Sequence, residues 1–431
     1  MSKIISEQFD VAVIGAGPAG MMAAIRAAQK GARVVLIEKK EQSGTKLLMT
    51  GNGRCNLTQD ENDIIKLSQK YGRNGKFILA SLKSFRPKAV REFFAGSGVP
   101  TKVEKDGRVF PESDQSKSVL EALVKVLKEN GITFLYKSDI VDFEFNSSEI
   151  PQGGSAKGAI PRGKITKLNL KKREIIAKNY IIATGGKSYP NTGSTGNGYE
   201  WAEKMGHTII TPTPILVPIK VKEDWISELQ GVSANSVSMS VYQNGKNKFS
   251  EFGDLMFAHF GLSGPLALNI SRELAHVISN GEIKLIIDFK PYLSFEKLDE
   301  IVRKDFEKNG KIKLANCLQD LFSPKLLDFL LKHSGLDLEK HAAKISRKER
   351  QKLVALFKGL EMNVESLFGF EKAMATSGGV STKEIDSKTM KSKIIANLFF
   401  AGEIIDVDGP TGGYNLQICW STGYVAGENA A

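Results

Sequence analysis

Three glycines near the start of the chain have the spacing that binds the phosphates of a dinucleotide. In the segment DVAVIGAGPAG they are Gly15, Gly17 and Gly20, and Glu38 follows in VVLIEKK. The first glycine allows a tight turn, the second lets a pyrophosphate approach the backbone, and the third lets the helix pack closely on the strand. Glu38 can accept hydrogen bonds from ribose hydroxyls, which favours FAD or NAD over NADP.

The elements around these residues form a strand–helix–strand pattern of about 30 residues, the usual length of a βαβ unit. FDVAVIG is a continuous apolar run, as in a parallel strand covered on both faces. AGMMAAIRAAQKG is small and apolar with one basic side, Gly31 ends it, and ARVVLIE supplies the second strand. The N-terminus of this helix offers N–H groups and a partial positive charge to the phosphates.

Two later glycine clusters separate FAD from NAD. IIATGG (181–186) places a glycine turn directly after a strand, where a second stretch of backbone can approach the cofactor. The segment 398–427 ends a strand in Ala-Gly-Glu, supplies Asp406 and begins a helix at Gly412 and Gly413. A helix N-terminus directed at the flavin pyrimidine ring would stabilise negative charge on the reduced ring. An extended FAD needs such contacts far from its pyrophosphate, so the sequence predicts FAD.

The middle of the chain differs in texture from both ends. Residues 208–290 contain short alternating runs separated by turns, which indicates an antiparallel sheet or barrel. The Gly-, Ser- and Pro-rich stretch 146–164 is interpreted as a surface loop or hairpin tip. We therefore predict an α/β FAD-binding domain made from residues 1–190 and 361–431, with an inserted β-rich substrate or cap domain (191–294) and a small helical module (295–360).

Composition restricts the class of protein. The chain has 431 residues, enough for two or three domains. Lys and Arg number 60 against 48 Asp and Glu, a net charge of +12. Such an excess attracts nucleic acid, an anionic cofactor or an acidic substrate, although a solvated basic surface is the simpler interpretation. With neither a signal-peptide pattern nor an apolar run of roughly 20 residues, we expect no membrane partner.

The cysteines and histidines argue against a redox disulfide and a metal site. Cys55, Cys317 and Cys419 are too far apart for a CxxC pair or a local zinc site. This spacing favours a reducing cytoplasm as the location. None of the five histidines has HxH or HExxH spacing, so no metal is expected.

Several longer motifs together resemble one known family. The chain is similar to the bacterial FAD flavoproteins that include aminoacetone oxidase and reductases related to those acting on 3-dehydro bile acids. The resemblance runs nearly end to end, and TGSTGNG after ATGG also resembles, more weakly, the fumarate reductase group. The motifs that carry it are KLLMTGNGRCNLT (46–58), DGRVFP (106–111), IIATGG, TGSTGNGYEWAEKMGH (192–207), MFAHFGLSGP (256–265), TSGGVS (376–381) and AGEIIDVDGPTGGYNLQ (401–417).

The resemblance implies a two-dinucleotide-binding-type, Rossmann-like FAD domain with an inserted barrel-like domain, and redox chemistry at the flavin. It favours cofactor contact for TGNGRCN (50–56), which would otherwise be interpreted as a polar turn. The cofactor-binding residues expected on this basis are Gly15, Gly17, Pro18, Ala19, Gly20, Glu38, Lys39, Lys46, Asn52, Gly53, Arg54, Cys55, Asn56, Val141, Ala183, Thr184, Gly185, Gly186, Gly402, Glu403, Asp406, Gly412, Gly413, Tyr414, Asn415 and Leu416.

Three residues are candidates for catalysis. His259, in a glycine- and proline-punctuated turn, is either a proton donor beside the flavin or a structural histidine. Arg54 is expected to face the pyrophosphate or the flavin edge. Arg108 either holds a substrate carboxylate or carbonyl by bidentate hydrogen bonds or fixes its loop through an ion pair. Cys55 is interpreted as a small packing residue rather than a redox thiol.

The chain has no second glycine fingerprint after a strand, so we expect no dedicated nicotinamide domain. FAD would then be reduced by the substrate itself or by NAD(P)H docking transiently. The leading hypothesis is an FAD-dependent oxidoreductase that transfers a hydride between flavin N5 and a small organic substrate. A tRNA-modifying flavoenzyme and a flavin-bound sensor or scaffold without turnover remain as alternatives.

Overall fold

The glycine turn joins a strand and a helix of a βαβ unit, as the sequence predicts. In the computed structural model, which describes residues 5–147 and 163–431, β1 (Ile5–Ile14) leads into α1 (Pro18–Gln29) and then β2 (Val34–Ile37). The two strands pair in parallel with Val13 opposite Leu36. Both strands are buried at these positions, because helices and loops cover the two faces of the sheet.

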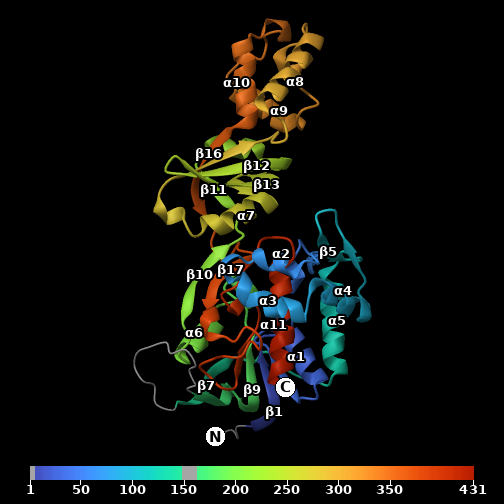
Figure 1. Ribbon diagram of the computed structural model, residues 1–431, viewed down its shortest axis with the longest axis vertical. Helices are drawn as coiled ribbons and strands as arrows, with labels where there is room; N and C mark the ends of the chain where they lie inside the picture. Colours follow the sequence, from blue (N-terminus) through green and yellow to red (C-terminus); the bar gives the residue numbers. More distant parts are fainter. Residues whose placement is uncertain (1–4, 148–162) are drawn as a thin grey trace. The chain divides into compact units, whose positions relative to one another are not determined.

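The main sheet contains seven strands and combines parallel and antiparallel pairs. Its order is β6-β2-β1-β9-β8-β7, and β18 pairs with β9 beyond this path. Figure 1 labels β1, β7 and β9 of this sheet. The pairs β6–β2, β2–β1, β1–β9 and β9–β18 are parallel, whereas β7, β8 and β9 form an antiparallel meander. The bounds are β6 (Thr133–Leu135), β7 (Ile140–Ser147), β8 (Gly163–Leu170), β9 (Arg173–Ile182) and β18 (Leu398–Phe400). The carboxyl ends of β1, β2 and β9 therefore meet at one edge, where ligands of such sheets bind.

The C-terminal helix α11 (Tyr414–Ala430) packs directly on α1. At Gly423 an added Cβ would lie 2.4 Å from the carbonyl oxygen of Ala19, and at Gly427 it would lie 2.3 Å from that of Ala23. Two glycines one helical turn apart thus let the two backbones approach closely. The first and last helices of the chain form one layer over the sheet, which joins the two ends of the sequence in one domain.

Further elements of the same domain surround this layer. They are the helices α2 (Ile64–Gln69), α3 (Gly75–Ser84), α4 (Pro87–Gly96), α5 (Ser116–Glu129) and α6 (Asn197–Lys204), and a small sheet of β3 (Thr58–Gln59), β5 (Arg108–Pro111) and β4 (Thr101–Val103). The indole N–H of Trp420 in α11 donates to the carbonyl oxygen of Leu57 (2.9 Å), which ties the helix to β3.

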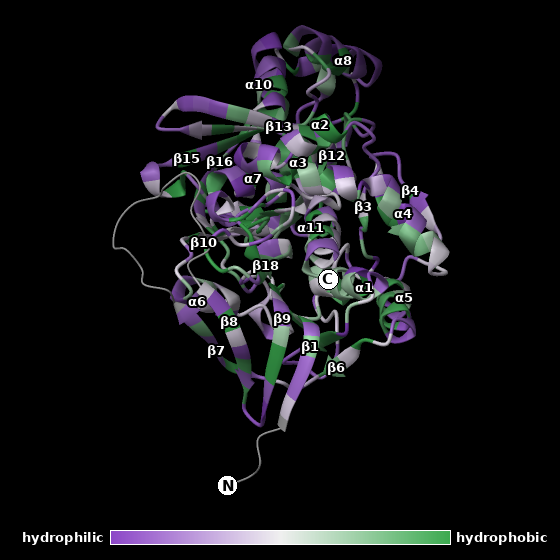
Figure 2. Cartoon of the chain, turned by 60° about the horizontal axis from the view of Figure 1, so that its bottom comes forward, coloured by the Kyte–Doolittle hydropathy of each residue, from purple (hydrophilic) through white to green (hydrophobic). Residues whose placement is uncertain are grey.

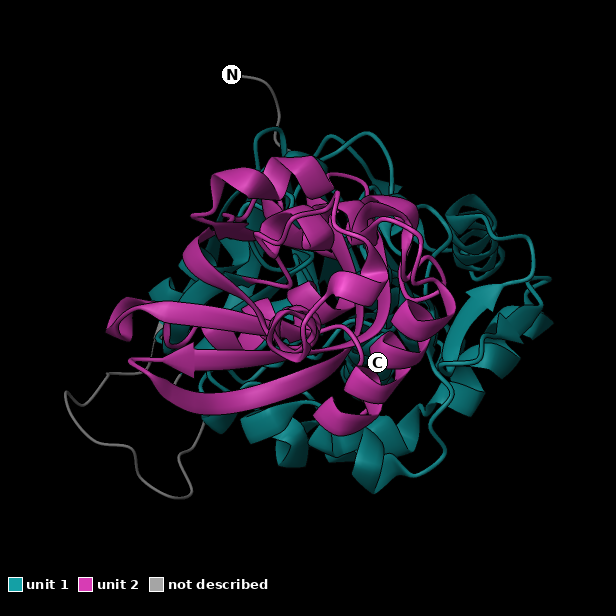
Figure 3. Cartoon of the chain, turned by 90° about the horizontal axis from the view of Figure 1, so that it is seen from above, with its two compact units in different colours: residues 1–214, 373–431 teal, residues 215–372 magenta. Residues whose placement is uncertain are grey.

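The chain divides into two units, residues 1–214 with 373–431 (unit 1) and residues 215–372 (unit 2) (Figure 3). The sequence placed the first boundary at 190/191, but α6 and most of β10 (Ile209–Ile215) belong to unit 1. The reason is that β10 pairs with β17 (Ala375–Val380), far away in the sequence. The return boundary also differs, because β16 (Leu360–Leu367) belongs to unit 2.

Unit 2 contains a closed six-stranded antiparallel barrel, which confirms the barrel-like prediction. The barrel order is β11-β14-β13-β12-β15-β16, with β11 (Ile219–Val221), β12 (Ser233–Gln243), β13 (Lys246–Ala258), β14 (Gly261–Ser263) and β15 (Ile283–Asp288). Its helices are α7 (Gly264–Leu274), α8 (Phe295–Lys308), α9 (Pro324–His333) and α10 (Arg347–Lys358). Buried residues of barrel and helices form one core cluster, and hydrophilic residues predominate on α8 and α10 (Figure 2).

Three sequence-based expectations concern a loop, membrane-spanning helices and metal-binding groups, and the described residues bear on each to a different extent. Most of the predicted loop 146–164 falls on residues 148–162, which lie outside them. No helix within 5–147 and 163–431 is long and apolar enough to cross a bilayer. The same residues contain no group of three His, Cys, Asp or Glu side chains arranged to hold a metal ion.

Candidate functional site

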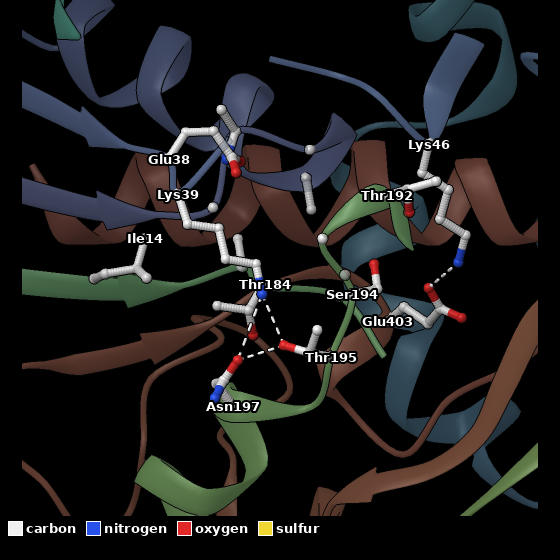
Figure 4. Close-up of a pocket in the computed structure, with 18 of the residues that line it drawn as sticks. Ile14, Glu38, Lys39, Lys46, Thr184, Thr192, Ser194, Thr195, Asn197 and Glu403 are labelled. Carbon is white, nitrogen blue, oxygen red and sulfur yellow. Dashed lines mark hydrogen bonds and ion pairs between the residues drawn. The ribbon is translucent and has the colours of Figure 1, made fainter. Parts of the chain in front are cut away.

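A cavity of about 520 Å³ opens in unit 1 at the carboxyl ends of β1, β2 and β9. Its lining comes from the β1–α1 turn, the end of β2, the turn after β9, the loop before α6 and the first turns of α11. Figure 4 shows Glu38 and Lys39 on one side of this space and Lys46 with Glu403 on the other. Segments nearly 400 residues apart in the sequence therefore enclose one site.

The three glycines of the β1–α1 turn have three distinct environments. An added Cβ at Gly15, where φ is +99°, would lie 2.6 Å from the carbonyl oxygen of Ala183. At Gly20 it would lie 1.8 Å from the carbonyl oxygen of Gly15. At Gly17 it would meet nothing within 4 Å. Gly15 and Gly20 thus hold the turn together, whereas Gly17 leaves space on the cavity side.

The N-terminus of α1 is open to an anion. Gly17 is its N-cap and provides no side-chain hydrogen bond, Pro18 begins the helix, and no acidic residue lies in the first turn. The N–H groups of this turn and the helix dipole are therefore available to a negatively charged ligand. This arrangement suits the pyrophosphate of a dinucleotide.

Glu38 is held in place by backbone donors. Its Oε2 accepts from the N–H of Ala16 (2.9 Å) and its Oε1 accepts from the N–H of Lys40 (2.9 Å). Each carboxylate oxygen has a further lone pair, so the group can still accept from ribose hydroxyls. The neighbouring Lys39 Nζ donates to Thr195 Oγ1 (2.7 Å), and burial lowers the pKa of this lysine.

Lys46 and Glu403 form an ion pair on the side of the cavity opposite Glu38 and Lys39 (Figure 4). Lys46 Nζ is 2.8 Å from Glu403 Oε2, and Glu403 also accepts from Ser188 Oγ (2.8 Å) and from the N–H of Thr376 (2.7 Å). Burial alone would raise the pKa of Glu403, but Lys46, Ser188 and Thr376 outweigh it and hold the pKa below its ordinary value. The acid is therefore ionised at neutral pH and locks three distant segments together.

One buried hydroxyl in the cavity wall has no partner among the described residues. Thr184 Oγ1, in the turn after β9, is shielded from solvent and makes no hydrogen bond within this part of the chain. It packs against α6, where an added Cβ at Gly198 would lie 2.1 Å from this oxygen. The open helix N-terminus, the space at Gly17 and the oriented acid fit an extended dinucleotide such as FAD.

The structure brings together many of the residues expected to bind the cofactor. Those that line the cavity are Gly15, Gly17, Pro18, Ala19, Glu38, Lys39, Lys46, Val141, Ala183, Thr184, Gly185, Gly402, Glu403, Asn415 and Leu416. Those outside its lining are Gly20, Asn52, Gly53, Arg54, Cys55, Asn56, Gly186, Asp406, Gly412, Gly413 and Tyr414. The cavity is also lined by four residues of the motif TGSTGNG that were not expected to bind the cofactor, Thr192, Ser194, Thr195 and Asn197.

Arg54 and Arg108 lie in an ion-pair network near the small sheet. Arg54 contacts Glu104 (2.6 Å) and Asp114 (2.7 Å), and its guanidinium carbon is 3.9 Å from the centre of the Phe110 ring. Arg108 pairs with the same Glu104 at 3.3 Å. Because acids hold both guanidinium groups, these contacts favour the loop-fixing alternative for Arg108, and Arg54, expected to face the pyrophosphate or the flavin edge, lies outside the cavity lining.

Asn56 and Asp406, two other residues expected to bind the cofactor, instead make hydrogen bonds within the protein. With its amide oriented to satisfy both ends, Asn56 donates to the carbonyl oxygen of Thr58 (3.0 Å) and accepts from the N–H of Gly413 (3.1 Å). Asp406 accepts from Arg73 at 3.0 Å. These bonds position the start of α11, whose first turns line the cavity.

Cys55 is fully buried, and burial raises the pKa of its thiol to about 12. A thiolate is the reactive form of cysteine, so we expect Cys55 to be inert in the folded protein. Treatment with a thiol reagent such as DTNB at about pH 8, near the ordinary thiol pKa, is expected to label Cys55 only after urea is added. Mass spectrometry of the labelled peptides measures this, and rapid native labelling of Cys55 would contradict it.

His259 belongs to unit 2, in the turn between β13 and β14. Its side chain is exposed, and its ring packs edge-to-face on Phe260 with the centroids 5.0 Å apart. Within the described residues its ring nitrogens make no hydrogen bond. His259 is not among the residues that line the cavity of unit 1.

The parallel strands, the glycine turn, the acid after β2 and the inserted barrel define a protein of the Rossmann type, and its family and full-length relatives identify it as an FAD-dependent oxidoreductase. It belongs to the HI0933-like family, since the HI0933-like protein Rossmann domain matches residues 9–429. The 3-dehydro-bile acid delta(4,6)-reductase of Clostridium scindens is 34% identical over 429 residues, covering 98% of each chain. The ribosomal RNA dihydrouridine synthase of Escherichia coli is 28% identical over 423 residues, also covering 98% of each.

Two solved structures show the same fold at low sequence identity. The 3-ketosteroid-delta4-(5alpha)-dehydrogenase from Rhodococcus jostii is 14% identical with a TM-score of 0.54, covering 100% of this chain and 97% of that one. The open conformation of a flavocytochrome c3 fumarate reductase is 18% identical with a TM-score of 0.52, covering 99% and 78%.

Proposed function

We propose that the protein reduces a carbon–carbon double bond conjugated to a carbonyl group in a small organic substrate. The observation that carries this proposal is the full-length similarity to a 3-dehydro-bile acid delta(4,6)-reductase. In that substrate the double bonds are conjugated to the 3-oxo group. A second full-length relative is a ribosomal RNA dihydrouridine synthase. Dihydrouridine synthesis also saturates a double bond conjugated to a carbonyl. The shared bond type supports one chemistry for this site.

The chain's own residues bind the cofactor and position it. Reduced FAD supplies a hydride donor at N5 when bound. The N-terminus of α1 would hold the pyrophosphate, and Glu38 would hold a ribose. In the reduction, the β carbon of the substrate receives the hydride with its electron pair. The α carbon then takes a proton from an acid or from water.

Replacing Glu38 with Ala is expected to weaken FAD binding about 10- to 100-fold, the cost of one or two lost hydrogen bonds to a charged group. The reason is that its carboxylate, held by Ala16 and Lys40, would no longer accept from the ribose. FAD affinity is measured by fluorescence titration of the apoprotein. The control is Glu41→Ala, since Glu41 is exposed and pairs with Lys137. Equal FAD affinity for both variants would show that Glu38 is misassigned.

His259 is proposed as the proton donor for the α carbon, because its ring nitrogens are exposed and have no partner within the described residues. His259→Gln is expected to lower kcat about 10²- to 10⁴-fold, the usual contribution of general acid catalysis, without loss of FAD. His276→Gln, at another exposed histidine in no motif, is the control. Steady-state kinetics with the flavin content measured in parallel decide this, and an unchanged kcat excludes the role.

The reaction itself is tested anaerobically through the flavin spectrum. We expect NADH or NADPH to bleach the flavin absorbance of the holoenzyme, and a steroid enone such as 4-androstene-3,17-dione to restore it. Product analysis should then show a saturated carbon–carbon bond. Reoxidation by dioxygen together with no reoxidation by any enone would indicate an oxidase and contradict the proposal.

A second candidate substrate is the uracil ring of an RNA. The full-length similarity to a ribosomal RNA dihydrouridine synthase favours it, because the C5=C6 bond of uracil is conjugated to a carbonyl. The same anaerobic assay with RNA in place of the enone distinguishes the two substrates.

A further inference from the structure

The helices α2, α3 and α4 of unit 1 carry a set of exposed cations without acidic partners. The residues are Lys66, Lys70, Lys76, Lys83 and Arg86, and all five side chains are exposed. Within residues 5–147 and 163–431, none of them makes an ion pair. We call this set the α2–α4 basic surface.

The acids around this surface are already engaged. Asp60 pairs with Arg91 at 2.9 Å, and the carboxylate of Asp63 caps α2 by accepting from the N–H of Ile65 (2.9 Å). Asp406 accepts from Arg73. Glu61 accepts from the N–H of Asp63 (2.8 Å) and, like Asp63, makes no ion pair within the described residues. The five cations outnumber these two acids, so the surface keeps a net positive charge, which attracts anions.

Sequence spacing puts the lysines of each helix on one face of that helix. Lys66 and the C-cap residue Lys70 are four residues apart at α2, and Lys76 and Lys83 are seven apart on α3, so each pair shares a helix face. The opposite faces are buried through Leu67, Ile78 and Leu82, among others. At Gly75 an added Cβ would lie 2.2 Å from the carbonyl oxygen of Ser68, so the two helices meet closely at this corner.

The same corner touches the segment that leads into the cofactor site. Tyr71 Oη donates to the carbonyl oxygen of Tyr414 (3.1 Å), and Asn74 donates to that of Asp406. Next to these contacts, Val407 and Asn415 line the cavity. The corner between α2 and α3 thus contacts the segment that supplies part of the cavity wall in unit 1.

The geometry points to RNA as the partner: we propose that the α2–α4 basic surface binds the phosphate backbone of an RNA. Lys76 and Lys83 alone are separated by about 10 Å along α3, and the five cations together carry more charge than one phosphate or carboxylate can neutralise. A strand of regularly spaced phosphates neutralises such a row. A bilayer is the less suitable partner, since Ile65, 51% exposed, is the one large apolar side chain that these helices expose, and interfacial helices need an apolar face.

This inference deepens the second substrate class named above, yet its test does not depend on turnover. Binding of a short fluorescein-labelled RNA hairpin to the FAD-loaded protein is measured by fluorescence anisotropy between about 50 and 200 mM KCl. We expect affinity to fall steeply with salt. Replacing Lys66, Lys70, Lys76 and Lys83 together with Gln should weaken binding at least tenfold at the lowest salt. It should also reduce the slope of log K against log salt by about 3.

The matched control changes the net charge by the same amount elsewhere. Lys308, Lys311, Lys344 and Lys348 in unit 2 are also exposed and make no ion pair within the described residues, and all four are replaced with Gln. This variant should bind RNA within twofold of the unmodified protein. Circular dichroism and the visible flavin spectrum show that both variants are folded and loaded.

Three outcomes would overturn the proposal. The first is no RNA binding by the unmodified protein at the lowest salt, and the second is an equal loss of affinity in both variants, which would reflect net charge alone. The third is capture of phosphatidylglycerol vesicles, abolished by the α2–α4 substitutions, together with unchanged RNA binding. A protein that binds RNA through this surface but reduces no uridine would leave the inference intact and reject the RNA substrate.

Discussion

Replacing Gly20 with Ala is expected to abolish FAD binding and to destabilise the protein by about 3 kcal/mol or more. The added Cβ would lie 1.8 Å from the carbonyl oxygen of Gly15. The sheet and α1 hold the backbone at both residues in place. Relief of the clash requires α1 to move away from β1, which opens the phosphate turn. Urea denaturation of the apoprotein and FAD titration measure the two effects. Unchanged unfolding would show that the turn is more pliable than its packing indicates.

Gly17→Ala in the same turn is the matched control, and it should separate folding from binding. An added Cβ here meets no protein atom within 4 Å, and φ is −79°, which any residue adopts. We expect the apoprotein to lose no more than about 1 kcal/mol, the usual cost of a poorer N-cap. FAD affinity should fall more clearly, because the methyl group enters space next to the helix N-terminus. Equal FAD affinity would mean that the pyrophosphate does not approach Gly17.

Local patterns predicted the parts of the fold that depend on neighbouring residues. The apolar run of β1, the glycine turn and the small-residue helix α1 follow each other in the sequence, so their pattern alone indicates a βαβ unit. The alternation in β12 and β15 likewise indicated strands with one buried face. These elements were predicted because each one is specified by residues close to one another in the sequence.

Contacts between distant segments were beyond such patterns. β16 closes the barrel although three helices separate it from β15 in the sequence, and β10 pairs with β17 more than 150 residues later. The domain boundaries of the structure therefore differ from those placed from the sequence. Arg54 was expected near the cofactor, but Glu104 and Asp114, its acidic partners, lie in other parts of the sequence. The loop residues 192–197 have no periodicity that would indicate a cavity wall.

The charged pair across the cavity gives the second large expected effect. Lys46→Met should destabilise the protein by about 2 kcal/mol at neutral pH. Breaking a buried ion pair costs about 3–5 kcal/mol, and partial exposure of these side chains, 21% for Lys46 and 17% for Glu403, reduces that cost. The double variant Lys46→Met with Glu403→Gln is the control, since it removes the unpaired carboxylate. Recovery of stability in the double variant would assign the cost to the charge, whereas no recovery would assign it to lost packing.

The sign of the pH dependence distinguishes this explanation from a general loss of structure. In the unmodified protein the pKa of Glu403 lies below its ordinary value of 4.5, so its contribution to stability is present above that pH and is lost as the pH falls through the folded pKa. Without Lys46, the burial that raises the pKa of Glu403 is opposed only by Ser188 and Thr376. The pKa should then rise, and the destabilisation by Lys46→Met should be smaller at about pH 5 than at pH 8. Urea denaturation at both pH values measures the difference, and an equal loss at both would show that Glu403 is not the group responsible.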